Sequence, residues 1–247
     1  NLSCVDENLV VSDWIHQTVD MDVAEEYSVG GIAGINLGML KASENSGTVT
    51  VSGKTETNAY IGGLIGRKNS SRFSIDCSNK GAVNASVDAA LVTAIGGIAG
   101  FMNNVAIDYA NMINKGDVEF VKGATCRGDV LIGGITGWQH FPVMANYVTA
   151  QNYGCGTQPA TNEGRVICSG SNEKDCYMGG IAGYTAREGE QEYTLPDNTT
   201  VTYVNSAGCY THTIVSKDEA GLVTEFAPAE VSHTNTGYIR FAGTTRN

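Results

Sequence analysis

Two aspartates could form a carboxylate pair. Asp76 and Asp108 each follow an isoleucine in segments that we interpret as equivalent strands. Equivalent residues on parallel strands stack about 4.8 Å apart, and two carboxylates at that spacing raise one pKa, bind a cation or hydrolyse a glycoside. The match depends on the alignment, because aligning Asn114 instead of Asn111 with Asn79 removes it. We therefore favour solvated surface aspartates.

The histidines and the phosphate-binding motifs give no sign of catalysis. The four histidines are His16, His140, His212 and His233, and none has metal-ligand spacing to Cys, Asp, Glu or another His. The chain has no Gly-x-Ser-x-Gly elbow, no Walker-type loop and no Rossmann fingerprint. We predict no catalytic residue, no metal site and no cofactor.

Aromatic residues gather at an insertion of about residues 138–161. Exposed rings there would stack on sugars or contact a protein, whereas buried rings would only fill the insertion. The candidate binding residues are Trp138, His140, Phe141, Tyr147 and Tyr153.

Seven cysteines are compatible with disulfides. Cys155, Cys168 and Cys176 cluster around the insertion and are the disulfide candidates. For Cys77, a disulfide and a small buried hydrophobe both stay open. The tripeptide that begins at Arg127, Arg-Gly-Asp, matches an integrin-recognition sequence of some animal matrix proteins, although three-residue matches often arise by chance.

The chain that must position these residues is built from repeats. The motif Gly-Gly-aliphatic-x-Gly occurs five times, and successive copies start 32, 34, 37 and 46 residues apart. The copies begin at Gly30, Gly62, Gly96, Gly133 and Gly179. This period is typical of architectures in which each unit buries its apolar face against its neighbours.

A second motif, Asn-x-Gly, keeps phase with the first. Asn45, Asn79, Asn114 and Asn162 precede the next Gly-Gly by 17, 17, 19 and 17 residues. Apolar and polar residues alternate after each copy, which predicts a half-buried strand. Length variation therefore falls mostly between Gly-Gly and the next Asn.

Three short strands per unit predict an all-β repeat solenoid, a right-handed parallel β-helix of about five to six three-stranded coils with atypical terminal units. A β-propeller is the alternative, but its blades need about 40–50 residues. So many glycines in a predicted strand indicate close approach of another backbone. The predicted inward residues are Ile32, Val49, Leu64, Ile75, Val83, Ile98, Val118, Ile135, Val166 and Ile181.

We predict one domain over residues 1–247. Residues 1–26 match neither motif and are the predicted N-terminal cap, residues 27–183 carry the repeats, and residues 184–247 form a degenerate C-terminal unit. Within that unit, Asn235-Thr236-Gly237 begins a sixth strand. We expect the C-terminal end to be the likelier assembly surface.

Composition narrows the function. Only 17% of residues are charged, yet the formal net charge is −11, which argues against nucleic acid and anionic membrane surfaces as partners. No apolar run approaches the ~20 residues that span a bilayer. Low Lys and abundant Asn, Thr, Ser and Gly indicate an extracellular or cell-surface location.

The unit Ile-x-Cys-x-Asn-x-Gly-x-Val followed by Gly-Gly-Ile-x-Gly, clearest over residues 75–100, resembles the GLUG-type repeat of surface and secreted proteins. The resemblance covers about residues 27–183. It implies an exported β-solenoid, adhesin-like, without catalytic residues.

We therefore expect a non-catalytic extracellular adhesion or structural protein that presents an acidic, polar solenoid surface. Its expected partners are an extracellular protein, a glycan, or other copies of itself, with neither nucleic-acid binding nor membrane insertion. The alternatives are a carbohydrate-active β-helix enzyme and a subunit of an extracellular filament.

Overall fold

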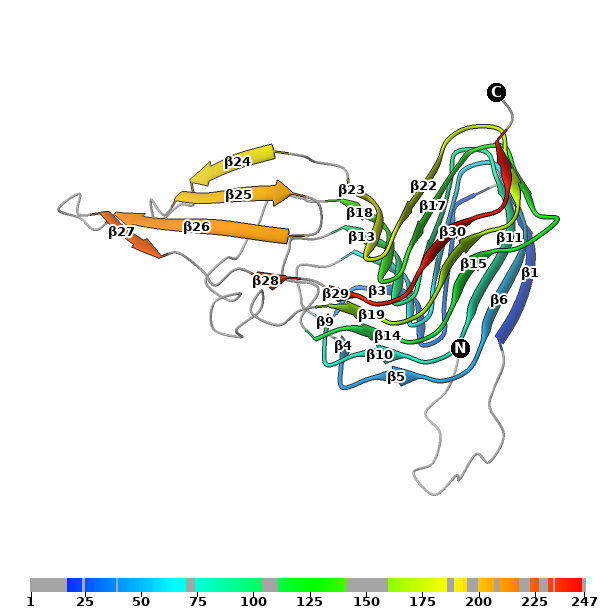
Figure 1. The fold of residues 1–247 in the computed structure, drawn as a ribbon, viewed down its shortest axis with the longest axis horizontal. Helices are drawn as coiled ribbons and strands as arrows, with labels where there is room; N and C mark the ends of the chain where they lie inside the picture. Colours follow the sequence, from blue (N-terminus) through cyan, green and yellow to red (C-terminus); the bar gives the residue numbers. More distant parts are fainter. Residues whose placement is uncertain are drawn as a thin grey trace, which may run out of the picture.

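The computed structural model describes residues 17–23, 25–38, 40–69, 74–103, 111–140, 160–185, 189–194, 200–206, 209–217, 223–226, 231–232 and 234–245. These residues form strands and turns, and most strands stack in parallel from coil to coil (Figure 1). The predicted all-β parallel solenoid is confirmed. In the described part of the chain, no helix is long and apolar enough to cross a membrane.

Two sheets make the first half of each coil. Sheet A has the order β1 (Gln17–Val23), β6 (Val49–Thr55), β11 (Val83–Ala89), β15 (Val118–Phe120), β20 (Val166–Cys168) and β30 (Ile239–Phe241). Sheet B has the order β2 (Tyr27–Gly30), β7 (Asn58–Gly62), β12 (Val92–Gly96), β17 (Asp129–Gly133) and β22 (Cys176–Gly179). All pairings in both sheets are parallel.

Two further sheets complete the coil. Sheet C contains β3 (Ala33–Asn36), β8 (Ile65–Lys68), β13 (Ala99–Asn103), β18 (Thr136–His140) and β23 (Ala182–Thr185). Sheet E contains β5 (Glu44–Asn45), β10 (Ser78–Asn79), β14 (Ile113–Asn114), β19 (Thr161–Asn162) and β29 (Thr234–Asn235). Short ladders occupy some corners: β4 (Leu40–Lys41) with β9 (Ser74–Ile75), and β16 (Thr125–Cys126) with β21 (Ser171–Asn172) and β31 (Thr244–Thr245).

Each complete coil therefore runs through four main strands, A, B, C and E, rather than the predicted three. The difference lies at Gly-Gly, which we interpreted as part of a strand. In the second coil, β7 ends at Gly62 and β8 begins at Ile65, so that the chain folds back between sheets B and C at this point. Figure 1 shows B and C as the two arms of a narrow V beside the long strands of sheet A.

The glycines let the arms of the V touch. A Cβ on Gly100 in sheet C would lie 2.2 Å from Ile61 N in sheet B, and one on Gly137 would lie 2.4 Å from Ile95 N. Real Cβ atoms do not approach backbone this closely. The predicted close approach of a second backbone is confirmed.

The Gly-Gly turn also touches the Asn-x-Gly corner. A Cβ on Gly97 would lie 2.2 Å from Gly134 O and 2.3 Å from Asn114 Cγ. Gly63 stands in the same way against Asn79, and Gly134 against Asn162. The two motifs keep phase in the sequence because they meet in every coil.

The asparagines form a ladder along the solenoid. Asn45 Nδ2 donates to Asn79 Oδ1 (2.9 Å), and the same bond joins Asn79 to Asn114, Asn114 to Asn162, and Asn162 to Asn235. Each Nδ2 also donates to the carbonyl of the glycine two residues later. We call this row of asparagines the asparagine ladder.

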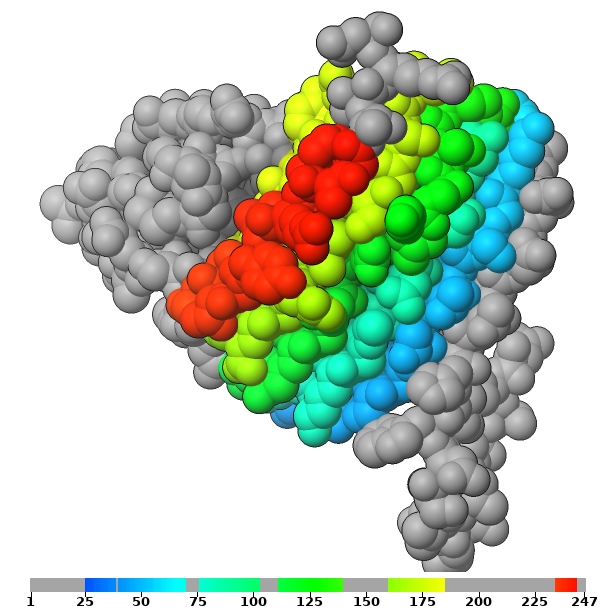
Figure 2. All heavy atoms as spheres, turned by 45° about the vertical axis from the view of Figure 1, so that its right-hand side comes forward, coloured from blue at the N-terminus to red at the C-terminus, as the bar shows by residue number. Residues whose placement is uncertain are grey.

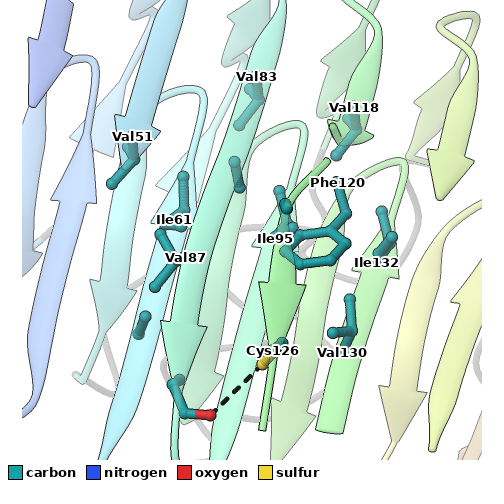
Figure 3. Close-up of a cluster of buried hydrophobic side chains, with 14 of the residues drawn as sticks. Val51, Ile61, Val83, Val87, Ile95, Val118, Phe120, Cys126, Val130 and Ile132 are labelled. Carbon is teal, nitrogen blue, oxygen red and sulfur yellow. Dashed lines mark hydrogen bonds between the residues drawn. The ribbon is translucent and has the colours of Figure 1, made fainter. Parts of the chain in front are cut away.

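Apolar cores lie on both sides of the V. One fills the space between sheets A and B, where Val83, Ile95, Phe120 and Ile132 point toward one another (Figure 3). The other joins the Gly-Gly turns to the residues before sheet E. Of the predicted inward residues, those buried are Val49, Leu64, Val83, Ile98, Val118, Ile135 and Val166.

Three predicted inward residues differ from these. Ile32 is 39% exposed because it lies in the first coil, where no earlier coil in the described part of the chain covers it. Ile181, in the fifth coil, is only partly buried. The side chain of Ile75 lies outside the described residues.

The two terminal regions contain more than the predicted cap and degenerate unit. Residues 17–23 form β1, which pairs with β6 as a strand of sheet A. Between β23 and β29, the chain forms antiparallel sheet G from β24 (Gly189–Thr194), β25 (Thr200–Ser206), β26 (Cys209–Lys217) and β27 (Val223–Phe226), with β28 (Val231–Ser232) on β26. The chain then rejoins the solenoid at β29, β30 and β31.

The contact at the Gly-Gly turn can be tested with a matched pair of substitutions. Gly97→Ala should lower the free energy of unfolding by about 3 kcal/mol, because its Cβ meets rigid backbone on a neighbouring coil. Gly38→Ala is the control, since a Cβ there meets nothing within 4 Å, and it should stay within about 0.5 kcal/mol of the wild type. Urea unfolding measures both, and equal effects would contradict the packing described.

Candidate functional site

The coils differ most at one corner, where the chain passes from sheet C to sheet E. The connection covers residues 37–43 in the first coil, then 69–77, 104–112, 141–160 and finally 186–233. We call these five connections the insertion corner. Sheet G leaves the solenoid here and extends away from it in Figure 1. The largest variation in length thus falls on one side of a regular stack, whereas the connection from sheet A to sheet B varies less, from residues 56–57 to residues 121–128.

Sheet C fixes where the connections start. β13 and β18 pair in parallel up to Asn103 and His140, and β18 and β23 pair up to Gln139 and Thr185. The connections of neighbouring coils therefore start one strand spacing apart, about 4.8 Å. The starting points of the connections therefore form a row along the solenoid axis.

A column of aromatic rings stands between sheets B and C beside this corner. Tyr60 stacks on Phe101, with ring centroids 4.8 Å apart and an interplanar angle of 21°. Phe101 and Trp138 pack edge to face, with ring centroids 4.9 Å apart and an interplanar angle of 65°. Tyr60 and Phe101 are buried and Trp138 is half-buried. The column fills the open end of the V.

The charged residues Arg67 and Glu26 lie beside the same column of rings. The Arg67 guanidinium carbon lies 5.9 Å from the Tyr60 ring centroid and 5.7 Å from that of Phe101, and Arg67 pairs with Glu26. Burial, and then the Glu26 carboxylate, raises the pKa of the Tyr60 phenol above its usual range. Tyr60 therefore stays neutral in the folded protein.

The predicted binding residues divide into two groups. Trp138 packs on Phe101 and supports the corner, so only part of its ring faces solvent. His140 ends β18, and its side chain lies outside the described residues, as do Phe141, Tyr147 and Tyr153 entirely.

Sequence reasoning missed Tyr60, Phe101 and Arg67. A signal for two of them exists in the repeat itself. The residue directly after the last glycine of each Gly-Gly motif points into this region, and the five such residues are Ile35, Arg67, Phe101, Trp138 and Tyr184.

The predicted disulfide is absent from the described residues. Cys168 and Cys176 are free thiols, and Cys155 lies outside the described part of the chain. The thiols of Cys168 and Cys176 interact, which lowers the pKa of Cys168 and, together with burial, raises that of Cys176. Cys168 occupies the core row of Phe120, so it packs as a small apolar side chain. Cys77 is also buried and forms no disulfide with a described cysteine, and its Sγ donates to Leu40 O at 3.7 Å.

The carboxylate pair does not form in the register that the structure adopts. Asn79 pairs with Asn114, which sets Asn111 opposite Asp76. Asn111 Nδ2 donates to Asp76 Oδ1 at 2.8 Å. Both residues have positive φ, 50° and 55°, and mark the same corner. Asp108 lies outside the described residues.

The Arg-Gly-Asp tripeptide is held within the solenoid. Arg127 donates to Asp88 from Nε (3.1 Å) and to Glu56 from Nη1 (3.0 Å). Gly128 is buried, and Asp129 accepts the Asp175 backbone N–H. The arginine and the aspartate thus both join neighbouring coils.

Comparisons with known proteins give no relative: no family model, curated protein or solved structure matches this chain. The resemblance to the GLUG-type repeat stays a prediction. Among the described residues, no group of three or more His, Cys, Asp or Glu side chains is placed to hold a metal ion.

The buried phenol of Tyr60 gives a prediction about pH. A group whose pKa is raised by folding stabilises the fold fully below its unfolded pKa, about 10 for tyrosine, and this contribution is lost as the pH rises toward the folded pKa. The wild type should therefore lose more stability than Tyr60→Phe between about pH 9 and 11. Urea unfolding across this range measures the difference. Tyr238→Phe, at an exposed tyrosine, should follow the wild type, and parallel curves for all three proteins would contradict the prediction.

Proposed function

We propose that this chain is a non-catalytic extracellular adhesion or structural protein that holds its ligand at the insertion corner. The observation that supports this most is that length varies far more at that corner than elsewhere in the coil. Sheets A, B and E repeat with constant register, while the connections after sheet C lengthen from residues 37–43 to residues 186–233. Binding residues commonly lie on variable loops that a rigid scaffold positions.

The spacing of the connections favours an elongated ligand. Neighbouring connections begin about 4.8 Å apart along one line, so a polysaccharide or an extended polypeptide could contact several in sequence. Trp138 packs on Phe101 of the aromatic column and so holds β18, the strand from which the fourth connection starts. The candidate contact residues on that connection are Phe141, Tyr147 and Tyr153.

The solenoid surface suits a solvated scaffold. Ion pairs connect neighbouring coils, including Lys80 with Glu44 and Lys115 with Glu163. Exposed pairs of this kind contribute little stability, about 0–1 kcal/mol, but they keep the outer faces polar. Together with the net charge of −11 and the composition, this supports an extracellular or cell-surface location.

The carbohydrate-active alternative has lost the observation that motivated it. It required Asp76 and Asp108 on adjacent coils, and the register sets Asn111 opposite Asp76. The filament alternative is favoured by a separate observation: among the described residues, every exposed large apolar side chain except Leu91 lies at one of the two ends of the solenoid.

A triple substitution tests ligand binding at the insertion corner. The variant Phe141→Ser, Tyr147→Ser and Tyr153→Ser should bind immobilised mucin or one of a panel of polysaccharides at least about tenfold more weakly than the wild type, because aromatic anchors dominate such contacts. Its unfolding midpoint should be unchanged. Leu91→Ser, at an exposed residue away from this corner, is the control.

Two outcomes would contradict the proposal. Either the triple variant binds as tightly as the wild type, or none of these probes binds the wild type. The same polysaccharides should also be assayed for release of reducing ends. Turnover that Asp76→Asn abolishes would show an enzyme instead.

A further inference from the structure

The exposed large apolar side chains lie at the two ends of the solenoid. Among the described residues, all of them except Leu91 belong to the first coil or to the fifth and sixth. The first-coil face is the end of the solenoid formed by the open edges of β2, β3 and β5, and it carries Ile32, Ile35 and Leu37. The last-coil face is the opposite end, formed by the open edges of β22, β23, β29 and β30. It carries Tyr177, Tyr184, Tyr238, Ile239 and Phe241. Figure 2 shows residues 234–243, in red, as the outermost band of the stack.

The two faces have complementary hydrogen-bonding groups. Inside the ladder, each asparagine donates to the next one and accepts from the one before. Asn235 Nδ2 donates to Gly237 O, and no coil in the described structure follows it to accept the second amide hydrogen. Asn45 Oδ1 accepts the Gly47 backbone N–H, and no coil among the described residues precedes it to donate a ladder bond. A donor thus ends one face and an acceptor ends the other.

The apolar groups also match when the register is extended by one coil. Tyr184 continues the row of Trp138 and Phe101 in sheet C, and Ile35 begins that row. A second copy placed on the last-coil face in the same register would set its Ile35, 57% exposed, against Tyr184, 40% exposed. In sheet E, its Asn45 would meet Asn235.

Sheet A adds a requirement, because it has six strands, whereas sheets B, C and E have five each. Its sixth strand is β30. If β5 of the second copy pairs with β29 of the first copy, then β6 of the second copy must pair with β30 of the first. Within a single copy, β1 already pairs with that edge of β6. In the backbone register, the row that contains Val49 and Val166 begins at position 17 of β1, a glutamine in the sequence, and ends at Ile239 of β30. Ile239 is 47% exposed and Phe241, the next inward residue, is 50% exposed. An aliphatic residue fits this row better than a glutamine.

We propose that copies of this chain associate head to tail, with β30 of one copy replacing β1 at the edge of β6 in the next. The asparagine ladder and sheets B, C and E then run from one copy into the next. The contact joins two different faces, and each copy is displaced from the one before it along the solenoid axis. Such an assembly does not close into a ring, so further copies can add at both ends of an open stack. This proposal is independent of the ligand at the insertion corner.

Two variants, each defective at one face, test the proposal. Phe241→Asp places a charge on the last-coil face, and Ile35→Asp places one on the first-coil face. Both side chains are at least half exposed, so each variant should fold, which circular dichroism checks. Sedimentation velocity should show species larger than the monomer for the wild type, growing with concentration, and only monomer for each variant alone.

The decisive sample is the equimolar mixture of the two variants. Each variant keeps one intact face, and the two intact faces are complementary, so the mixture should form a one-to-one heterodimer and nothing larger. Leu91→Asp is the matched control, since Leu91 is 49% exposed in the middle of the solenoid, and it should associate like the wild type.

Three results would overturn the proposal. A wild type that stays monomeric at high concentration excludes association. A homodimer of either variant alone indicates a contact between like faces. A mixture that stays monomeric, or a Leu91→Asp variant that loses association, shows that the larger species do not form through these faces.

Discussion

The hydrogen bonds of the asparagine ladder set the position of the other elements of the solenoid. Asn79, Asn114 and Asn162 are fully buried, so an amide group left without a partner would cost about 1–3 kcal/mol at each position. Each amide finds its partners only if the coils above and below present an asparagine in the same place. The ladder therefore fixes the register of sheet E, and the glycine two residues later turns the chain into sheet A.

The glycines extend this constraint across the coil. The tip of each Gly-Gly turn touches a ladder asparagine, and the last glycine of the motif touches sheet B of the coil before it. Sheets A, B, C and E are thus bound to one register, and an insertion in most of the coil would break a contact on a neighbouring coil. The corner between sheets C and E lies away from both contacts and carries the longest connections. This explains why the longest connections gather there and why we place ligand binding at that corner.

The repeated parts of the fold could be predicted from the sequence, and the unrepeated parts could not. The phase between Asn-x-Gly and Gly-Gly, and the excess of glycine, revealed a parallel solenoid with closely approaching backbones. The turn inside Gly-Gly was missed because two flanking strands and a tight turn give the same apolar pattern as one strand. Ile32 was predicted to be inward from its repeat position, but burial also requires a neighbouring coil. Cys168 and Cys176 were predicted as disulfide candidates from their clustering, whereas the structure shows them as thiols without a disulfide. Tyr60 and Phe101 were missed because their contact joins different coils and depends on the register between them.

The most direct test of this account is the free energy of unfolding of Asn114→Ala. Asn114 Nδ2 donates to Gly116 O and to Asn162 Oδ1, both at 2.8 Å, and its Oδ1 accepts from Asn79. The account predicts a loss of about 3 kcal/mol, because buried partners on two coils lose their bonds. Asn84→Ala, in sheet A and outside the ladder, should cost less than about 1 kcal/mol. Equal losses for the two variants would contradict the central role of the asparagine ladder.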